Sequence, residues 1–293
     1  MGRRGALRSV PRRRTVPIPG GGQLPHAAAP FLGTSVAPEE RKGWLAAQGG
    51  VSVWPWAVLA AAGVGYTLGA QVVARAGFAV RRGPGRSQVA LTFDDGPHPE
   101  YTLRIVDVLA RYRVRATFFF VGRYALELPD VAREVARAGH SLGSHTFSHG
   151  HLWTLGPRAT WREVAEGVRA VQQATGVRPI YFRPPWGAFN LTALAACRRL
   201  GLVAVLWTVR GEGYRWKPAA DQMAREVVRR AHPGAVVNLH DRGGFPDTPQ
   251  RVLEALPRMV EGLRSRGLEP VSLDELLRAG HGAGPAGRPV QLE

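Results

Sequence analysis

The sequence predicts an α/β fold in which parallel strands form a barrel, preceded by one membrane-spanning helix. From Ser87 onward, short apolar runs alternate with amphipathic stretches, as in consecutive βαβ units. Seven such strands without a dinucleotide-binding glycine motif favour a barrel over an open, doubly wound sheet. Further upstream, the stretch Val51–Ala74 contains no charged residue and is long enough to cross a bilayer.

The N-terminal third divides into three parts. Residues 1–50 are rich in Arg, Gly, Pro and Ala and lack a regular apolar pattern, which predicts a disordered basic segment. Residues 51–74 are expected to form a transmembrane helix or signal anchor, with Trp54 and Trp56 at the membrane interface. A cleaved signal peptide is the alternative, although its apolar region would be shorter and nearer the N-terminus. Residues 75–86 are expected to be a linker.

The charges around this helix give conflicting indications of its orientation. Arg75 and three further arginines up to residue 86 follow the helix, which favours a cytoplasmic C-terminal side. The arginine-rich cluster near the N-terminus favours the opposite orientation.

The elements of the domain expected at residues 87–279 follow from apolar periodicity and from glycines at helix ends. The expected strands are Val89–Phe93, Ala116–Val121, Ser141–Ser144, Ile180–Phe182, Val203–Trp207, Ala235–Leu239 and Pro270–Ser272. The expected helices are Thr102–Tyr112, Pro129–Ala138, Arg158–Ala174, Leu191–Leu200, Asp221–Ala231, Gln250–Arg266 and Leu273–Arg278. Residues 280–293 are expected to be a flexible tail.

Composition limits the classes of function. The formal net charge is +17, but residues 1–86 carry twelve Arg or Lys and two Glu, so more than half of the excess lies outside the predicted domain. A nucleic-acid-binding role is therefore not expected. The single cysteine, Cys197, rules out an internal disulfide and a multi-cysteine zinc site, and its apolar neighbours predict a buried structural thiol.

Polar clusters follow four of the predicted strands, on the side of a barrel that carries the chemistry. Asp94 and Asp95 follow the first strand, where two adjacent carboxylates are costly unless something neutralises them. His145 and His149 follow the third strand, four residues apart, so a helical turn would place both imidazoles on one side. Two histidines and a carboxylate are a common catalytic zinc set that leaves positions for water.

Two further clusters complete the expected rim. Arg183 follows the fourth strand, and its natural partner in a buried position is one of the two aspartates. The Pro-Pro-Trp-Gly stretch at 184–187 would fix the backbone so that an N–H points at a developing oxyanion. His240 follows the sixth strand and would serve as an acid near neutral pH. A rigid loop with a surface arginine and a hydrogen-bonded core histidine are the structural alternatives.

These motifs resemble those of the polysaccharide deacetylases with a NodB homology domain, carbohydrate esterase family 4. Leu91–Pro97 (LTFDDGP) is similar to their first motif, and His145–His149 to their His-(Ser/Thr)-x-x-His motif. Arg183–Gly187 resembles their Arg-Pro-Pro-Tyr-Gly motif, with Trp186 in place of tyrosine. Leu239–Asp241 resembles their Leu-x-His motif, although here the histidine follows the leucine directly.

The resemblance implies a distorted (β/α)7 barrel and a divalent cation, most readily Zn²⁺, with Co²⁺, Mn²⁺ or Ni²⁺ as alternatives. It implies that the metal is bound by Asp95, His145 and His149. It implies that Asp94 is the general base, that His240 is the general acid and that Arg183 orients Asp94. It also implies substrate contacts from Trp186, through its backbone N–H at the oxyanion, from Pro185, and from Leu239, at the acetyl methyl.

One motif differs from the family pattern. The family has Asp-x-x-Asp-Trp after the fifth strand, where an aspartate supports the acid–base machinery. Aligned without gaps, Arg210 and Tyr214 replace the first aspartate and the tryptophan. With two inserted residues, Glu212 takes the place of that aspartate and Arg215-Trp216 follow. We favour the second alignment. Under the first, His240 loses its carboxylate partner and the support for activity weakens.

The resemblance implies metal-dependent N-deacetylation of an N-acetylated polysaccharide. The membrane anchor expected at residues 51–74 favours a cell-surface polymer, most readily peptidoglycan N-acetylglucosamine, and we expect the protein to be a monomer in the cell membrane. The substrate argues for a domain that faces outside, against the local arginine count. Two alternatives remain open. One is hydrolysis of a small amide or imide, and the other is a catalytically impaired wall-binding module.

Overall fold

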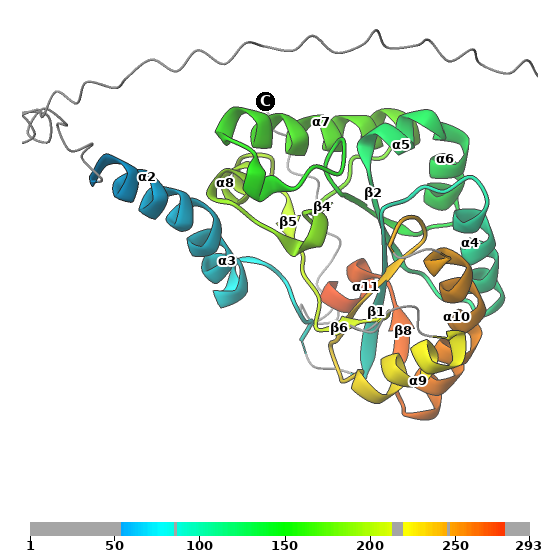
Figure 1. The fold of residues 1–293 in the computed structure, drawn as a ribbon. Coiled ribbons are helices and arrows are strands. Elements are labelled where there is room, and N and C mark those ends of the chain that lie inside the picture. The colour runs from blue at the N-terminus through cyan, green and yellow to red at the C-terminus, as the bar shows by residue number, and fades with distance from the viewer. Residues whose placement is uncertain (1–53, 85–86, 213–218, 245–246, 279–293) are drawn as a thin grey trace, which may run out of the picture. The chain divides into compact units, whose positions relative to one another are not determined.

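The computed structural model describes residues 54–84, 87–212, 219–244 and 247–278, which contain a curled parallel sheet with helices around it (Figure 1). The strands are β1 (Gln88–Asp94), β2 (Thr117–Phe120), β3 (Ser141–Ser144), β4 (Tyr181–Phe182), β5 (Val203–Ala204), β6 (Val209–Arg210), β7 (Val236–His240) and β8 (Glu269–Val271). Their order is β5-β4-β3-β2-β1-β7-β6, with β8 paired to β1 and each pair parallel. The predicted barrel is thus present as a half-barrel.

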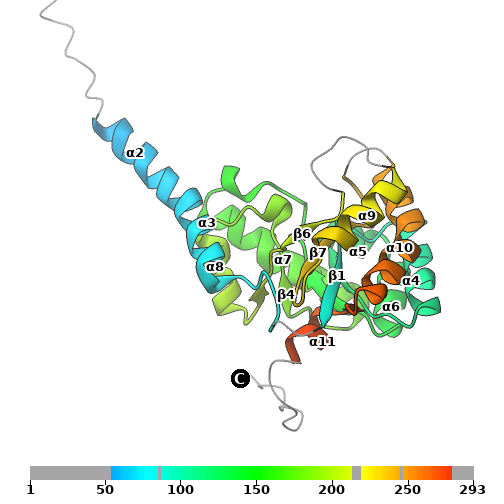
Figure 2. The same ribbon diagram turned by 90° about the horizontal axis from the view of Figure 1, so that it is seen from below.

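The helices lie outside the strands (Figure 2). They are α4 (Tyr101–Arg111), α5 (Gly122–Glu127), α6 (Pro129–Arg137), α7 (Pro157–Thr175), α8 (Leu191–Arg199), α9 (Ala220–Arg230), α10 (Thr248–Ser265) and α11 (Leu273–Arg278). Each long helix buries one apolar stripe, as Ile105 and Leu109 of α4 illustrate. Sequence periodicity predicts all of them except α5. Cys197 of α8 is fully buried, and burial raises the pKa of its thiol to about 12, as expected of a structural thiol.

One predicted strand, Val203–Trp207, is wrong in its extent. The strand ends at Ala204 as β5, and the chain then leaves the ladder and forms β6 beyond the predicted segment, so residues 203–210 supply both edges of the sheet. Eight strands are therefore described instead of the seven predicted. Val80 and Arg82 form isolated bridges to Val205, just after β5, and to Ala235, just before β7, so the chain that precedes β1 lies against the sheet.

The register of the sheet brings the predicted motifs to one rim. Asp94 at the end of β1 pairs with His240 on β7 and with Phe119 on β2. Ser144, the residue before the first histidine of the pair, is opposite Phe182, the residue before Arg183. Because the carboxyl ends of parallel strands meet at the same edge, the clusters after these strands converge.

The apolar N-terminal stretch forms a continuous helix from Trp54 to Phe78 that is long and apolar enough to cross a membrane. It consists of α2 (Trp54–Val64), η1 (Gly65–Gly69), α3 (Ala70–Val73) and η2 (Ala74–Phe78), where η1 and η2 are π-helical turns. No residue of α2 is buried, whereas Ala70 and Ala74 are fully buried against the domain. The span predicted at 51–74 therefore has an exposed half and a half that packs on the domain. The segments predicted at 1–50 and 280–293 lie outside the described residues.

Gly167 on α7 sets the distance between this helix and the loop that carries the two histidines. A Cβ at this position would lie 2.6 Å from the carbonyl carbon of Thr146 and 2.8 Å from its oxygen. Because backbone atoms cannot move aside as a side chain can, Gly167→Ala should destabilise the fold by about 1–3 kcal/mol, despite the higher helix propensity of alanine. The midpoint of thermal unfolding measures this. Gly150→Ala, whose Cβ would have no contact under 3.5 Å, is the control; equal midpoints for the two variants would contradict the packing argument.

Candidate active site

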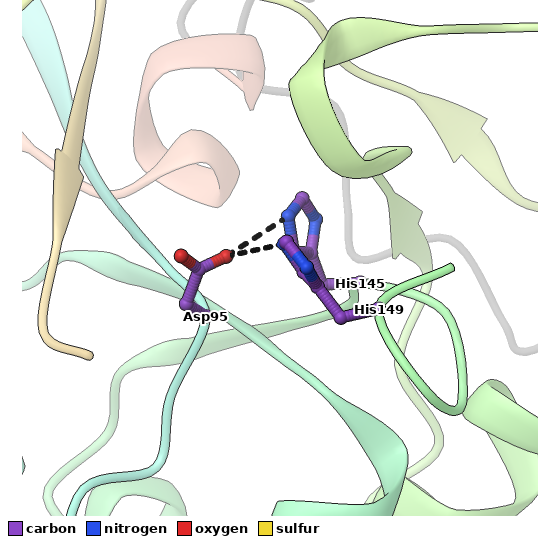
Figure 3. A group of neighbouring side chains, drawn as sticks. All are labelled: Asp95, His145 and His149. Atoms are coloured by element: carbon purple, nitrogen blue, oxygen red, sulfur yellow. Dashed lines mark ion pairs between the residues drawn. The ribbon is translucent and has the colours of Figure 1, made fainter. Parts of the chain in front are cut away.

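Asp95 lies directly after β1 and presents one carboxylate oxygen to both histidines (Figure 3). Its Oδ1 is 3.3 Å from Nε2 of His145 and 2.9 Å from Nε2 of His149. The potential ligand atoms of the three residues all lie within 4.8 Å of one another. Oδ1 is buried and receives no hydrogen bond of normal geometry. The three ligands predicted from sequence therefore face one another, as the ligands of a metal ion do.

A backbone contact orients one imidazole. Nδ1 of His145 lies 2.7 Å from the carbonyl oxygen of Arg183. A carbonyl only accepts, so Nδ1 carries a hydrogen, and Nε2 is the nitrogen left to bind a cation beside Asp95. Imidazole nitrogens and a carboxylate oxygen that meet at one point are the donor set of a divalent cation such as zinc. The residues therefore fit the metal that the sequence implies.

The charge state of Asp95 agrees with this arrangement. Burial by itself would raise the pKa of Asp95, but its contacts with His145 and His149 and the charge of His240 hold that pKa far below its usual range. The carboxylate is ionised at neutral pH, which a metal ligand requires.

The helical turn predicted between the two histidines is wrong. Thr146 and His149 have φ angles of 67° and 65°, in the left-handed region, and no helix is assigned there. The carboxylate of Glu163 on α7 instead accepts hydrogen bonds from the backbone N–H groups of Phe147 and Ser148, at 3.1 and 2.9 Å. A loop stabilised by hydrogen bonds to α7 brings the two imidazoles together. The sequence prediction that they lie on one side is confirmed, but a helical turn is not the cause.

Asp94 is held by donors on both carboxylate oxygens. Arg183 Nη1 donates to Oδ1 at 2.6 Å, so the predicted arginine–aspartate pair is present. The Asn238 amide donates to Oδ2 at 2.6 Å. Arg183 is fully buried, and burial lowers its pKa against the opposing influence of Asp94. Its guanidinium lies 4.1 Å from the centre of the Phe119 ring, so both charge and packing fix its position.

His240 has the carboxylate partner that the second alignment predicts. Its Nδ1 lies 2.9 Å from Oε1 of Glu212, and the Glu212 side chain is only 4% exposed. Burial tends to lower the pKa of His240, but the charges of Glu212, Asp95 and Asp94 outweigh it and raise that pKa to about 10. Arg215 and Trp216, which complete that alignment, lie outside the described residues.

These groups surround one cavity of about 540 Å³. Its described lining residues are Asp94, Asp95, Tyr124, His145, His149, Trp186, Trp207, Arg210, Glu212, Asn238, His240, Arg242, Gly243, Gly244 and Thr248. The Trp186 side chain is 61% exposed and packs against His149, with ring centres 4.8 Å apart. The cavity therefore combines a metal-ligand set, a fixed carboxylate and a charged histidine with an aromatic wall.

Comparisons with known proteins identify the family. A family model described as polysaccharide deacetylase matches residues 81–205. The chitooligosaccharide deacetylase of Bradyrhizobium sp. (strain ANU 289) is 35% identical over 214 residues, covering 68% of this chain and 96% of that protein. The chain belongs to the polysaccharide deacetylase family. Members of this family are hydrolases that act on N-acetyl amide bonds.

Other relatives include active and inactive proteins. The peptidoglycan-N-acetylglucosamine deacetylase of Bacillus cereus is 32% identical over 194 residues, covering 66% of this chain and 89% of that protein. A solved peptidoglycan N-acetylglucosamine deacetylase superposes with a TM-score of 0.63 at 29% identity, covering 68% of this chain and 92% of that one. A family 4 pseudoenzyme from Bacillus anthracis superposes with a TM-score of 0.61 at 27% identity, covering 67% of each chain.

Two predicted substrate contacts of this polysaccharide deacetylase are not where the sequence places them. Leu239 is fully buried and Pro185 is buried, and neither lines the cavity. Successive side chains of a strand point to opposite faces, so the residue that shares the face of His240 is Asn238 and not Leu239. Asn238 thus occupies the position of the leucine in the family motif. Applying the strand period to β7 identifies it from sequence.

Asp241 is a second polar residue of this deacetylase for which sequence analysis proposes no role. It is fully buried, and Thr102 donates a hydrogen bond to its Oδ2. Burial, together with the charges of Asp95 and Asp94, raises the pKa of Asp241 to about 7, although Thr102 opposes the shift. A Cβ on Gly96 would lie 2.3 Å from the same Oδ2, so Asp241 packs directly beneath the turn that carries Asp94 and Asp95.

His145→Ala should abolish tight metal binding by this deacetylase. Loss of one of three protein ligands removes a nitrogen donor and leaves Asp95 with one imidazole. We expect zinc affinity to fall by more than about 100-fold, beyond the effect of changing an outer-shell residue. Metal content after dialysis and calorimetric titration measure the change. His151→Ala changes the same residue type two positions beyond His149 and should retain the metal; equal zinc content in the two variants would contradict the assignment.

Proposed function

We propose that the protein removes acetyl groups from N-acetylglucosamine residues of peptidoglycan and releases acetate. In this proposal, Asp95, His145 and His149 hold a divalent cation, most readily zinc. The proposal rests on one observation, namely that a metal-ligand set, an ion-paired carboxylate and a histidine–carboxylate pair line the same cavity. Amide hydrolysis requires these three components together.

Asp94 is placed to act as the general base. A cation bound by the three ligands would lower the pKa of water and polarise the acetamide carbonyl. Arg183 and Asn238 each occupy one lone pair of an Asp94 oxygen. An ionised carboxylate has about four lone-pair sites, so it retains the capacity to accept the proton of the attacking water. The two donors also prevent the carboxylate from turning away from the cavity.

His240 is placed to act as the general acid. The amine that leaves the tetrahedral centre needs a proton, and Glu212 keeps His240 protonated through its charge. The contact with Nδ1 directs the other ring nitrogen away from Glu212. The backbone N–H of Trp186 would stabilise the developing oxyanion, as the family resemblance implies.

The cell wall is the substrate that fits the rest of the chain best. A relative named for peptidoglycan N-acetylglucosamine is 32% identical. The exposed, apolar α2 would anchor a monomer in the membrane with its domain outside, where wall polymer is available. A relative named for chitooligosaccharides points to the same N-acetylated sugar chemistry.

The two alternatives lead to different assays. A hydrolase of small amides or imides should turn over such compounds and reject N-acetylglucosamine oligomers. The similarity to a pseudoenzyme raises the alternative of an impaired wall-binding module. The residues proposed as ligands, base and acid all line one cavity, which favours catalysis. Mass spectrometry of peptidoglycan and chitin oligomers after incubation would register the loss of acetyl groups and tests the proposal.

Asp94→Asn should reduce acetate release from N-acetylglucosamine oligomers by about 10²–10⁴-fold, the usual contribution of a general base. The amide keeps the shape of Asp94 but cannot accept the proton. Zinc content should stay at the wild-type level, because Asp94 is not among the three ligands. Asp107→Asn, an exposed change on α4, is the control and should retain full activity. Substantial turnover by Asp94→Asn would refute the assignment.

Glu212→Gln should move the alkaline limb of the kcat/KM profile to lower pH. In the native protein, Glu212 and the nearby aspartates raise the pKa of His240 from 6.5 to about 10, so the imidazole keeps its proton at neutral and mildly alkaline pH. Glutamine retains an acceptor but loses the charge, and burial then lowers the pKa. We expect a displacement of at least about one pH unit. A bound cation would lower the pKa of His240 in both proteins, so the difference between them is the quantity to measure. Glu254→Gln on exposed α10 surface is the control; an unshifted limb in Glu212→Gln would exclude the proposed pair.

A further inference from the structure

Gln71 is a buried polar side chain within the charge-free N-terminal helix. It is 7% exposed, on the face of α3 that packs against the domain next to the fully buried Ala70 and Ala74. The small side chains of the two alanines let the helix approach closely. A buried amide is costly unless its donor and acceptor are both used. The position of Gln71 therefore requires partners on the domain.

Both ends of the Gln71 amide bind the backbone of the loop that follows Arg183. Nε2 donates to the carbonyl oxygen of Gly187 at 2.9 Å, and the N–H of Phe189 donates to Oε1 at 2.9 Å. Both hydrogen bonds are buried, so neither backbone group has water as a substitute. Gln71 thus fixes the two ends of a three-residue turn.

This turn directly follows the residue proposed to bind the oxyanion. Trp186 has a φ angle of 56° and Gly187 one of 67°, two successive left-handed residues. A large side chain in this conformation persists only where its surroundings hold it. Two prolines restrict the chain before Trp186. After Trp186, the hydrogen bond from Gln71 to the carbonyl oxygen of Gly187 restrains the chain.

We infer that Gln71 is a positioning residue for catalysis: the N-terminal helix holds the Trp186 turn in its reactive conformation. Gln71 lies outside residues 81–205, the part of the chain that the family model matches. The helix proposed to anchor the protein is in this view also a support of the active site. The kinetic consequence rests on the proposed deacetylase function, whereas the restraint on the loop does not.

The test compares two variants of the full-length chain in detergent micelles. Gln71→Leu removes both hydrogen bonds to the loop and introduces an apolar side chain of similar size. Tyr66→Phe removes the 3.0 Å hydrogen bond from the same helix to Thr192 on α8, away from the loop. We expect kcat on N-acetylglucosamine oligomers to fall about tenfold in Gln71→Leu, less than the loss of an entire oxyanion donor. KM should change less than about threefold, since the ground state makes little use of that donor. Zinc content should be unchanged.

Hydrogen exchange of the backbone provides a readout that does not depend on activity. The Phe189 amide should exchange faster in Gln71→Leu and at the wild-type rate in Tyr66→Phe. A folded Gln71→Leu with wild-type kcat, or an equal loss of kcat in Tyr66→Phe, would overturn the inference. If the wild type releases no acetate, the proposed function fails. Hydrogen exchange then tests the restraint alone, and an unchanged exchange rate of the Phe189 amide in Gln71→Leu would contradict it. Gln71→Glu keeps the acceptor for Phe189 but not the donor to Gly187, and replaces Gln71→Leu if that variant does not fold.

Discussion

The buried guanidinium of Arg183 is the constraint on which the site depends. Its side chain donates to Asp94 at 2.6 Å and to Thr92 at 2.8 Å, both on β1. Its backbone carbonyl accepts from His145, so the same residue determines which nitrogen of that imidazole is free. A fully buried charge is tolerated only with such partners. One residue therefore fixes the base and orients a metal ligand, and it also begins the loop that carries Trp186.

The pairing of charges indicates where a cation belongs in this cavity. Asp94 is paired with Arg183 and Glu212 with His240, whereas the carboxylate of Asp95 faces the two imidazoles. A divalent cation beside the turn that carries Asp95 would neutralise this carboxylate and supply positive charge that suits an oxyanion. Asp241 lies beneath the same turn, and the raised pKa of its carboxyl limits further negative charge there.

Sequence reasoning succeeds here where one strand end or one motif contains the necessary information. The strand ends predict Asp94, Asp95, Arg183 and His240, because parallel strands bring their carboxyl ends to one rim. It fails where geometry comes from elsewhere in the chain. The histidine loop takes its left-handed conformation with support from Glu163 on α7, and no local spacing reveals that contact. The motif alone places Leu239 at the cavity, whereas the strand period places Asn238 there, on the same face as His240.

The N-terminal helix shows why a domain boundary drawn from composition falls in the wrong place. An apolar stretch followed by an arginine-rich segment suggests an anchor and a linker. In the structure, however, Gln71 binds the active-site loop, and Val80 and Arg82 form bridges to Val205, just after β5, and to Ala235, just before β7. The stretch from Ala70 to Arg82 thus belongs to the folded domain. If α2 inserts into a membrane as proposed, this docking leaves little free chain between the bilayer and the cavity. The enzyme would then act on polymer close to the membrane, since a rigid support does not let the domain reach outward as a flexible linker would.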